Sequence, residues 1–260
     1  MKKGYKFLGI STVLLIFLLN ACNCASAGEP FSDIAEKAQK AYADGQYHYA
    51  IELYDSILKQ GYTSAALYYN IGNAYFKTNQ MPYAIWYYEK ARKLAPGDES
   101  INFNLNLANT LITDKIDALP KLFYVRWWQS TYGLFNTDTW AKISIILVFL
   151  IFIFLAFFLI ARSVTFKKLS FFLTLTFFIL AIFTLIFAGK QYSETYKQQS
   201  AIVFSPRITA KSSPDENSID LFVIHEGTKV IIQDNLGEWC EIKLANGNVG
   251  WIKKSLVKTI

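Results

Sequence analysis

Two long runs without a charged residue limit what this chain can fold into more than any other feature. They cover residues 143–161 and 169–189, which makes them 19 and 21 residues long. About 20 apolar residues in a helix cross the hydrocarbon core of a bilayer. We therefore expect two transmembrane helices in a multidomain membrane protein with soluble parts.

The segment between the two runs, residues 162–168, sets the expected orientation. It contains Arg162, Lys167 and Lys168 and no acidic residue. Cytoplasmic loops of membrane proteins carry an excess of Lys and Arg. We expect this loop in the cytoplasm and both flanking parts in the periplasm, outside a bacterial inner membrane. Neither run holds an ionisable residue, which disfavours a transport role.

Residues 1–27 have the three parts of a secretory signal peptide, which predicts export of the domain that begins near Gly28. Three Lys residues precede an apolar stretch over 7–19, and small residues end at Ala27. An alternative stays open, because residues 19–22 resemble a lipobox, in which Cys22 would become the acylated first residue. The Ala-Ser-Ala sequence at 25–27 favours removal of Cys22 with the signal.

A sequence unit recurs with a period of 34 residues. The segment 65–98 carries small and bulky residues at regular spacing: Tyr68, Ile71, Gly72, Tyr75, Ala84, Tyr88, Ala91 and Pro96. A weaker copy lies 34 residues earlier: Ile34, Ala38, Ala41, Ala50, Tyr54 and Ile57. This pattern resembles the tetratricopeptide repeat, a helix-turn-helix unit. We predict an all-α domain over 31–113, with helices over 32–44, 47–60, 65–78, 81–94 and 99–113, the last one capping the second repeat.

The resemblance to tetratricopeptide repeats implies a concave groove that binds an extended peptide or a partner helix. Amide side chains at matching repeat positions would pair with a peptide backbone. The residues implied in this partner-binding surface are Gln39, Tyr69, Asn70, Asn73, Phe76, Lys77 and Asn104. The alternative is that the Asn side chains only satisfy helix ends and neighbouring repeats.

The segment 114–142 joins the repeats to the first apolar run. It is rich in aromatic residues with basic neighbours, as in Arg126-Trp127-Trp128. Such residues favour the headgroup layer of a bilayer. We predict a helix here that lies on the membrane surface.

Residues 195–260 change to short β-branched runs separated by turn residues. Five strands are predicted, over 201–203, 221–224, 228–232, 239–244 and 249–252. Gly227, Trp239 and Gly250-Trp251 stand where they do in bacterial SH3-like domains, which this segment resembles. The resemblance implies a small all-β barrel that binds peptides or cell-wall material. We interpret Trp239 and Trp251 as barrel core and rim rather than as a binding platform.

No motif in the sequence indicates catalysis, a metal or another cofactor. Cys240 and His225 could form a thiol pair, but Cys240 follows a Trp within a predicted core strand, and no oxyanion motif accompanies it. The net charge of +6 lies mainly beside the apolar runs, which disfavours nucleic-acid binding. We therefore expect a protein that is not an enzyme.

The order of these parts resembles the Bat E family of the Bacteroides aerotolerance operon. The segment 104–140, between the repeats and the membrane, is the most family-specific part. The resemblance implies an envelope scaffold that acts with von Willebrand factor A-type membrane proteins and a MoxR-type ATPase in stress or aerotolerance. The alternative function is a sensor that binds peptidoglycan through the SH3-like module.

Overall fold

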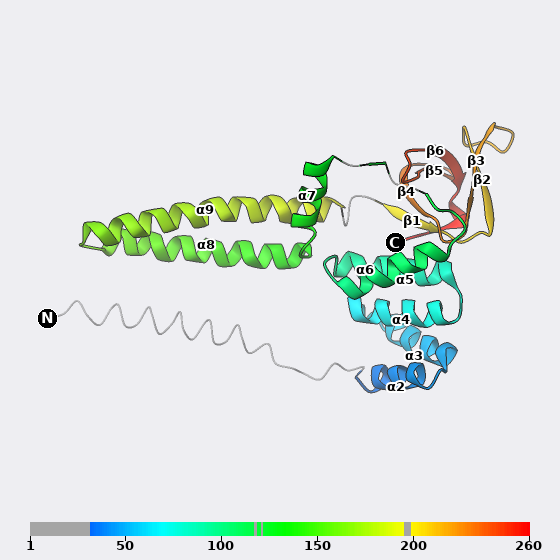
Figure 1. Cartoon of the computed structure of the whole chain (residues 1–260), viewed down its shortest axis with the longest axis horizontal. Coiled ribbons are helices and arrows are strands. Elements are labelled where there is room, and N and C mark those ends of the chain that lie inside the picture. The colour runs from blue at the N-terminus through cyan, green and yellow to red at the C-terminus, as the bar shows by residue number, and fades with distance from the viewer. Residues whose placement is uncertain (1–31, 117–118, 121, 195–198) are drawn as a thin grey trace. The chain divides into compact units, whose positions relative to one another are not determined.

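The computed structural model describes residues 32–116, 119–120, 122–194 and 199–260, with helices first and strands last (Figure 1). The helices are α2 (Ser32–Ala43), α3 (Tyr47–Lys59), α4 (Ala65–Lys77), α5 (Met81–Leu94), α6 (Glu99–Leu111), α7 (Phe123–Tyr132), α8 (Thr137–Ile160) and α9 (Val164–Tyr192). The strands are β1 (Ser200–Val203), β2 (Arg207–Lys211), β3 (Asp220–His225), β4 (Lys229–Leu236), β5 (Trp239–Lys243), β6 (Val249–Lys253) and β7 (Val257–Thr259). The predicted signal peptide with Cys22 lies outside the described residues.

The chain divides into two compact units between Gln60 and Gly61. In the first unit, α2 packs against α3. The second unit holds all elements from α4 onward. The five helices predicted for residues 31–113 are confirmed, each ending within two residues of its predicted bound.

Each unit contains a helix pair with the same turn, and the two turns lie 34 residues apart. Gly45 and Asn79 both have a positive φ, of 78° and 60°, in the region that Gly and Asn tolerate best. After them, the N–H of Gln46 donates to the carbonyl of Ala41 at 2.8 Å, and the N–H of Gln80 donates to that of Tyr75 at 3.0 Å. The predicted period therefore recurs in the backbone as well as in the sequence.

Small residues are buried where the helices of each pair meet. Ala38 and Ala50 are buried in the first unit, and Gly72 and Ala84 in the second. A Cβ atom on Gly72 would lie 2.6 Å from two ring carbons of Tyr88 on α5. Glycine at this position allows α4 to approach the Tyr88 ring closely.

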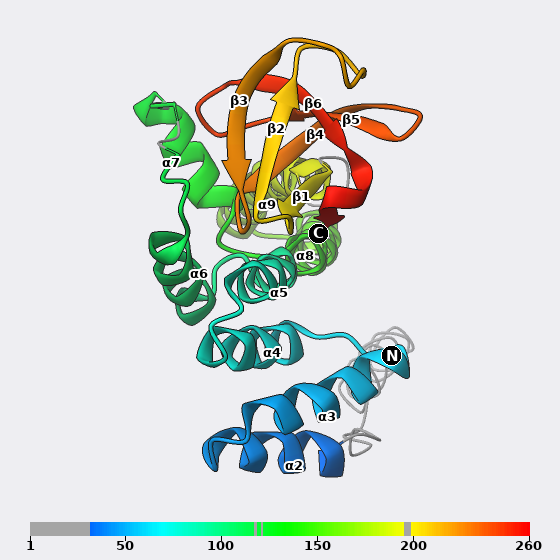
Figure 2. The same cartoon turned by 90° about the vertical axis from the view of Figure 1, so that its right-hand side faces the viewer.

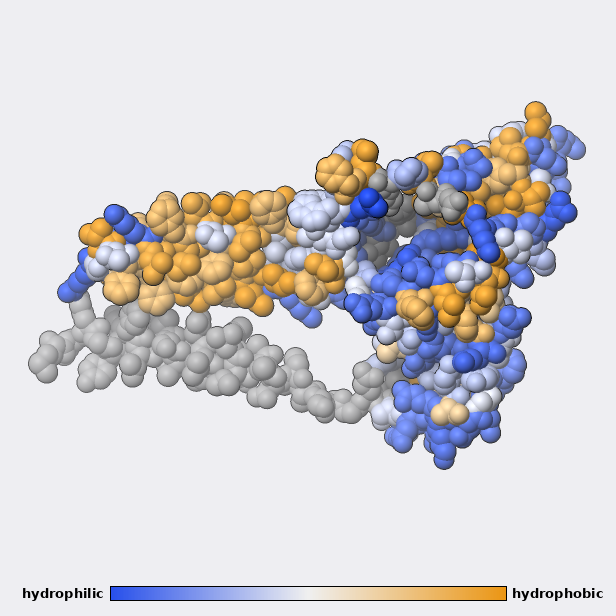
Figure 3. Space-filling view, in the orientation of Figure 1, coloured by the Kyte–Doolittle hydropathy of each residue, from blue (hydrophilic) through white to orange (hydrophobic). Residues whose placement is uncertain are grey.

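Helices α8 and α9 are long and apolar enough to cross a membrane, and they lie side by side (Figure 1). Most of their large apolar side chains are exposed, and these side chains form the continuous orange surface in Figure 3. A helix from the core of a soluble protein would bury such side chains. Ser144 of α8 donates a hydrogen bond of 2.9 Å to Thr184 of α9.

Both apolar helices extend beyond the predicted spans. Helix α8 begins at Thr137 because Asn136 caps it, accepting a hydrogen bond from the N–H of Thr139 at 2.9 Å. Helix α9 begins at Val164, so Lys167 and Lys168 lie in its first turns instead of in a seven-residue loop. Long basic side chains on such a turn still reach the headgroup layer.

The strands form one antiparallel sheet in the order β3-β2-β6-β5-β4-β1-β7. The structure has seven strands where the sequence predicts five. Strand β2 was missed because only two of its residues are β-branched and it buries only Ile208 and Ala210, and β7 was missed because it has three residues. The predicted turns are present, with a positive φ at Gly237 and Gly247.

Strand β1 is buried on both faces. Ala201 and Val203 pack into the core of the sheet, while Ile202 packs between Ile85 and Tyr88 of α5 and Leu105 of α6. Figure 2 shows α5 lying between α4 and the sheet. The second helix pair is therefore covered by β1 as well as by α6, which alone was expected to cap it.

We predict that Gly72→Ala destabilises the α4–α5 pair. The added Cβ meets a Tyr88 ring that is almost fully buried, and overpacking of this kind costs about 1–3 kcal/mol. Gly189→Ala is the matched control, because nothing lies within 4 Å of its Cβ position. The thermal unfolding midpoint, followed by circular dichroism in detergent, should fall for the first variant alone. Equal midpoints for both variants would contradict the close approach.

Candidate functional site

The predicted partner-binding residues lie on three helices. Gln39 is exposed on α2 in the first unit. The other residues lie in the second unit, on α4 except for the last, which lies on α6: Tyr69, Asn70, Asn73, Phe76, Lys77 and Asn104. Phe76 and Tyr69 are partly buried against the core that contains Ile202.

The structure brings Asn73 and Asn104 together, but it also uses their polar atoms. The Asn73 side-chain oxygen accepts hydrogen bonds from the Tyr88 hydroxyl at 2.7 Å and from the Asn104 amide at 2.9 Å. The Asn104 amide also donates to the Tyr69 hydroxyl at 2.9 Å. These contacts tie α4, α5 and α6 together, which favours the structural alternative for this pair.

Asn70 and Lys77 differ from that pair. They lie two turns apart on α4, so they face the same side of the helix. Asn70 is half-buried and Lys77 is exposed, and neither side chain makes a hydrogen bond or ion pair with another described residue. Among the predicted surface residues of the second unit, these two have polar groups available to a partner.

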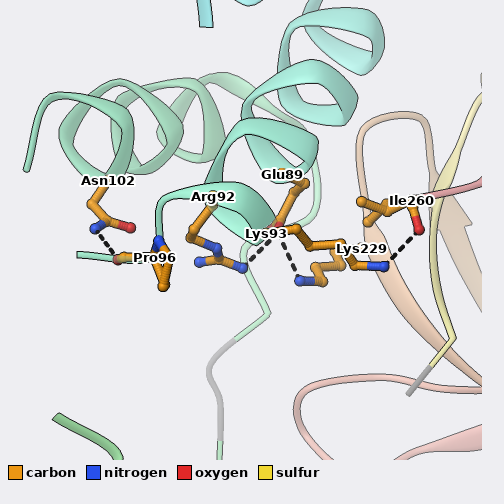
Figure 4. A network of polar contacts seen from close by, with 7 residues as sticks. All are labelled: Glu89, Arg92, Lys93, Pro96, Asn102, Lys229 and Ile260. Carbon is orange, nitrogen blue, oxygen red and sulfur yellow. Dashed lines mark hydrogen bonds and ion pairs between the residues drawn. The ribbon is translucent and has the colours of Figure 1, made fainter. Parts of the chain in front are cut away.

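A second polar cluster joins α5 to the sheet (Figure 4). Glu89 is buried on α5, and its Oε2 atom accepts from Arg92 at 2.6 Å and from Lys229 of β4 at 2.9 Å. Lys93 donates to the main-chain oxygen of Ile260 at 2.7 Å. A buried carboxylate shared by two cations fixes the position of β4 against α5, because any separation would leave a charge unpaired.

Burial, together with neighbouring positive charges in the case of Lys229, lowers the pKa values of the lysines in this cluster. Burial lowers the pKa of Lys229; Glu89 opposes this effect, and the charges of Arg92 and Lys93 add to it. Burial also lowers the pKa of Lys93. This cluster was not predicted from the sequence. Its one signal is that Glu89 stands four residues after Ile85, at a helix position that otherwise faces the core.

A third polar contact connects the segment after α6 to the turn between β3 and β4. The Asp114 carboxylate accepts from the N–H of His225 at 2.6 Å and from the Thr228 hydroxyl at 2.8 Å, and the His225 ring nitrogen Nδ1 lies 2.7 Å away. Burial would raise the pKa of Asp114, but the hydrogen bonds from His225 and Thr228 hold it below its ordinary value.

Cys240 and His225, the candidate thiol pair, have separate surroundings in the structure. Cys240 is fully buried in the sheet core, and burial raises the pKa of its thiol. The His225 ring pairs with Asp114 instead. A nucleophilic cysteine needs an exposed thiol of lowered pKa, so Cys240 does not have the surroundings of a catalytic thiol.

The two tryptophans of the sheet are not in its core, so the core part of the core-and-rim interpretation from sequence is wrong. On β5 and β6 the buried residues are Cys240, Ile242, Gly250 and Ile252, and Trp239 and Trp251 alternate with them. Both tryptophans therefore stand on the opposite face, partly exposed. On that face Trp251 pairs with Glu241 across the strands, and the Lys253 ammonium lies 5.8 Å from the Trp239 ring centre.

Neither a protein-family model nor a curated protein matches this sequence.

We predict that the Asp114 contact makes stability depend on acid. Because its pKa is lowered in the folded state, its contribution is fully present above about pH 4, the ordinary range of Asp, and is lost as the pH falls through the lowered folded-state pKa. Asp114→Asn should lower the free energy of unfolding by about 1.5–3 kcal/mol at pH 7 and make it fall less on acidification.

Thermal unfolding between pH 7 and pH 3 measures this effect. Asp220→Asn is the control, because the Asp220 side chain is exposed and its ion pair with Lys211 is expected to contribute little. The same pH profile for Asp114→Asn and the native chain would rule out the contact as a source of acid sensitivity.

Proposed function

We propose that this chain is a non-enzymatic scaffold anchored in the bacterial inner membrane. The observation that carries the proposal is the shared core at Ile202, which holds the helix pair α4–α5 and the sheet in one unit. A protein that presents two binding surfaces in a fixed relation to each other suits assembly of a complex. The arrangement of α8 and α9 supports anchoring by two spans.

The expected orientation places the basic end of the spans in the cytoplasm. Arg162 precedes α9, and Lys167 and Lys168 lie in its first turns. By the positive-inside rule both the helical repeats and the sheet would then be periplasmic. Helix α7, with Phe123 and Trp127 exposed, suits the headgroup layer beside the spans.

The class of partner comes from the sequence resemblances. The 34-residue period supports assignment of α2–α5 to tetratricopeptide repeats, and the sheet suits an SH3-like module. The resemblance to the Bat E family adds to the proposal that the chain acts with von Willebrand factor A-type membrane proteins and a MoxR-type ATPase in envelope stress or aerotolerance. The surface we assign to the partner is centred on Asn70 and Lys77.

A pull-down from detergent-solubilised membranes tests this surface. We expect the double variant Asn70→Ala, Lys77→Ala to fold normally and to recover partners at least several-fold less well than the native chain, because it removes the available polar groups. Asn106→Ala with Lys115→Ala is the matched control, since both residues are exposed and lie outside the proposed surface. Mass spectrometry identifies the proteins recovered.

A stability measurement and a comparison of recoveries complete the pull-down. Asn73→Ala should lower the unfolding midpoint, because Asn73 bridges three helices. Equal recovery of partners by the native chain and the folded Asn70/Lys77 variant would refute the assigned surface.

The tryptophan face of the sheet favours a second candidate function, binding of peptidoglycan. Trp239 and Trp251 are partly exposed on neighbouring strands, with Glu241 and Lys253 on the same face. Aromatic rings flanked by polar groups suit contact with sugar rings and short peptides. In this function the sheet would bind the wall while the helices recruit a partner.

Sedimentation of the detergent-solubilised chain with purified cell wall tests this second function. We expect Trp251→Ala to reduce the sedimented fraction severalfold, because the variant removes one ring of the face without opening the core. Tyr49→Ala, which removes an exposed aromatic residue of α3, is the control. If the native chain stays in the supernatant, peptidoglycan binding is excluded.

A further inference from the structure

A cavity of about 360 Å³ lies where α5, α7, the end of α9 and the sheet meet. Its wall includes the basic side chains of Arg92, Lys93 and Lys229, and the side chain of Gln191 at the end of α9. Small-molecule sites are typically concave and of about 300–1,000 Å³, with a few converging polar groups. The cavity has the size of such a site, and its lining is mainly polar and charged.

The positive charge in this cavity exceeds what its own carboxylates balance. Arg92 and Lys229 share the single carboxylate of Glu89. Lys93 adds a third cation to the lining, and it donates one hydrogen bond to the main-chain oxygen of Ile260. An anion in the cavity would relieve this crowding.

The second acid of the lining, Glu194, is engaged elsewhere. Its carboxylate accepts a hydrogen bond from the Tyr132 hydroxyl and lies 3.8 Å from the Lys190 ammonium. Burial and the neighbouring carboxylate raise the pKa of Tyr132 well above its usual range, so the phenol stays protonated and keeps donating. Glu194 is therefore held by its own partners on the α7–α9 side of the cavity.

Gln191 is an independent indication of a ligand. Its side chain is only 7% exposed, it lines the cavity, and its amide makes no hydrogen bond with another described residue. Its amide N–H groups are therefore available to a bound acceptor. The phosphate oxygens of a ligand are acceptors of this kind, and Arg and Lys are their usual charged donors.

We propose that this cavity binds the phosphate group of an anionic lipid, with Arg92 and Lys93 as charged donors and Gln191 as an amide donor. The lipid source rests on the proposed membrane anchoring, since Gln191 follows the apolar part of α9, where the headgroup layer would begin. Lys229 remains bound to Glu89 and keeps the sheet in place. Free phosphate offers the same chemistry, so the experiment separates the two sources.

The test uses the full chain in detergent and three probes: dioleoylphosphatidylglycerol, dioleoylglycerol and inorganic phosphate. The thermal unfolding midpoint, followed by tryptophan fluorescence, is measured against the concentration of each probe. Phosphatidylglycerol should raise the midpoint saturably. Dioleoylglycerol, which has the same acyl chains without phosphate, should leave it unchanged. Inorganic phosphate should act only at far higher concentration.

Variants then assign the effect to the cavity. Arg92→Gln with Lys93→Gln should raise the half-saturating lipid concentration at least about tenfold, because two charge-assisted hydrogen bonds are lost. Arg207→Gln with Lys243→Gln removes the same charge from positions outside the cavity lining and should bind as the native chain does. The charge-conserving Arg92→Lys, Lys93→Arg variant should retain most binding.

The Arg92/Lys93 double variant could fold poorly, because it removes two cations. Gln191→Leu keeps the ion pairs and therefore tests lipid binding to the cavity independently of them. It should weaken lipid binding several-fold without lowering the midpoint of the lipid-free chain. Unchanged half-saturation in the Arg92/Lys93 or Gln191 variants would overturn the proposal, and so would an equal effect of dioleoylglycerol. Equal potency of inorganic phosphate and lipid would overturn the lipid source and leave a phosphate site. The partner surface on α4 is tested by other variants, so the two proposals can fail separately.

Discussion

Burial of β1 on both faces is the packing constraint on which the second unit depends. Ala201 and Val203 belong to the sheet core, and Ile202 between them belongs to the helical core, so three consecutive residues lie within two apolar environments. Full burial of one isoleucine stabilises by about 1.5–3 kcal/mol. Since that stabilisation exists only when helices and sheet are together, neither side of the junction completes its core alone.

Polar contacts at the edge of this junction give it one specific geometry. Apolar packing tolerates some sliding of the helices against the sheet. The hydrogen bonds of Glu89 with Lys229 and of Asp114 with the β3–β4 turn do not, because sliding would break them and leave polar groups without a partner. The indole N–H of Trp86 adds a third fixed point by donating to the Thr259 carbonyl at 2.8 Å. Helices and sheet of the second unit therefore meet in a single register.

Sequence reasoning succeeded where a pattern is local and repeated. The 34-residue period, the turns at Gly45 and Asn79 and the two apolar helices all depend on contacts between residues near in sequence. It failed for contacts between distant segments. Nothing local in Ala201-Ile202-Val203 shows that its second face meets α5, and nothing local in Glu89 shows a cation 140 residues away. Apolar and polar residues alternate along β5, and this alternation indicates the face on which Trp239 lies. The general tendency of aromatic residues to be buried led to the wrong prediction.

The asparagines show why a family pattern cannot by itself assign a binding residue. Asn73 matches the position that would bind a peptide, yet the chain places a tyrosine hydroxyl and a second amide on the same oxygen. An oxygen that already accepts two hydrogen bonds has little capacity for a third. Asn70, one turn earlier on α4, has the same side chain without those neighbours. The difference between a structural and a recognition amide therefore lies in what the adjoining helices supply, and α5 and α6 supply it at Asn73.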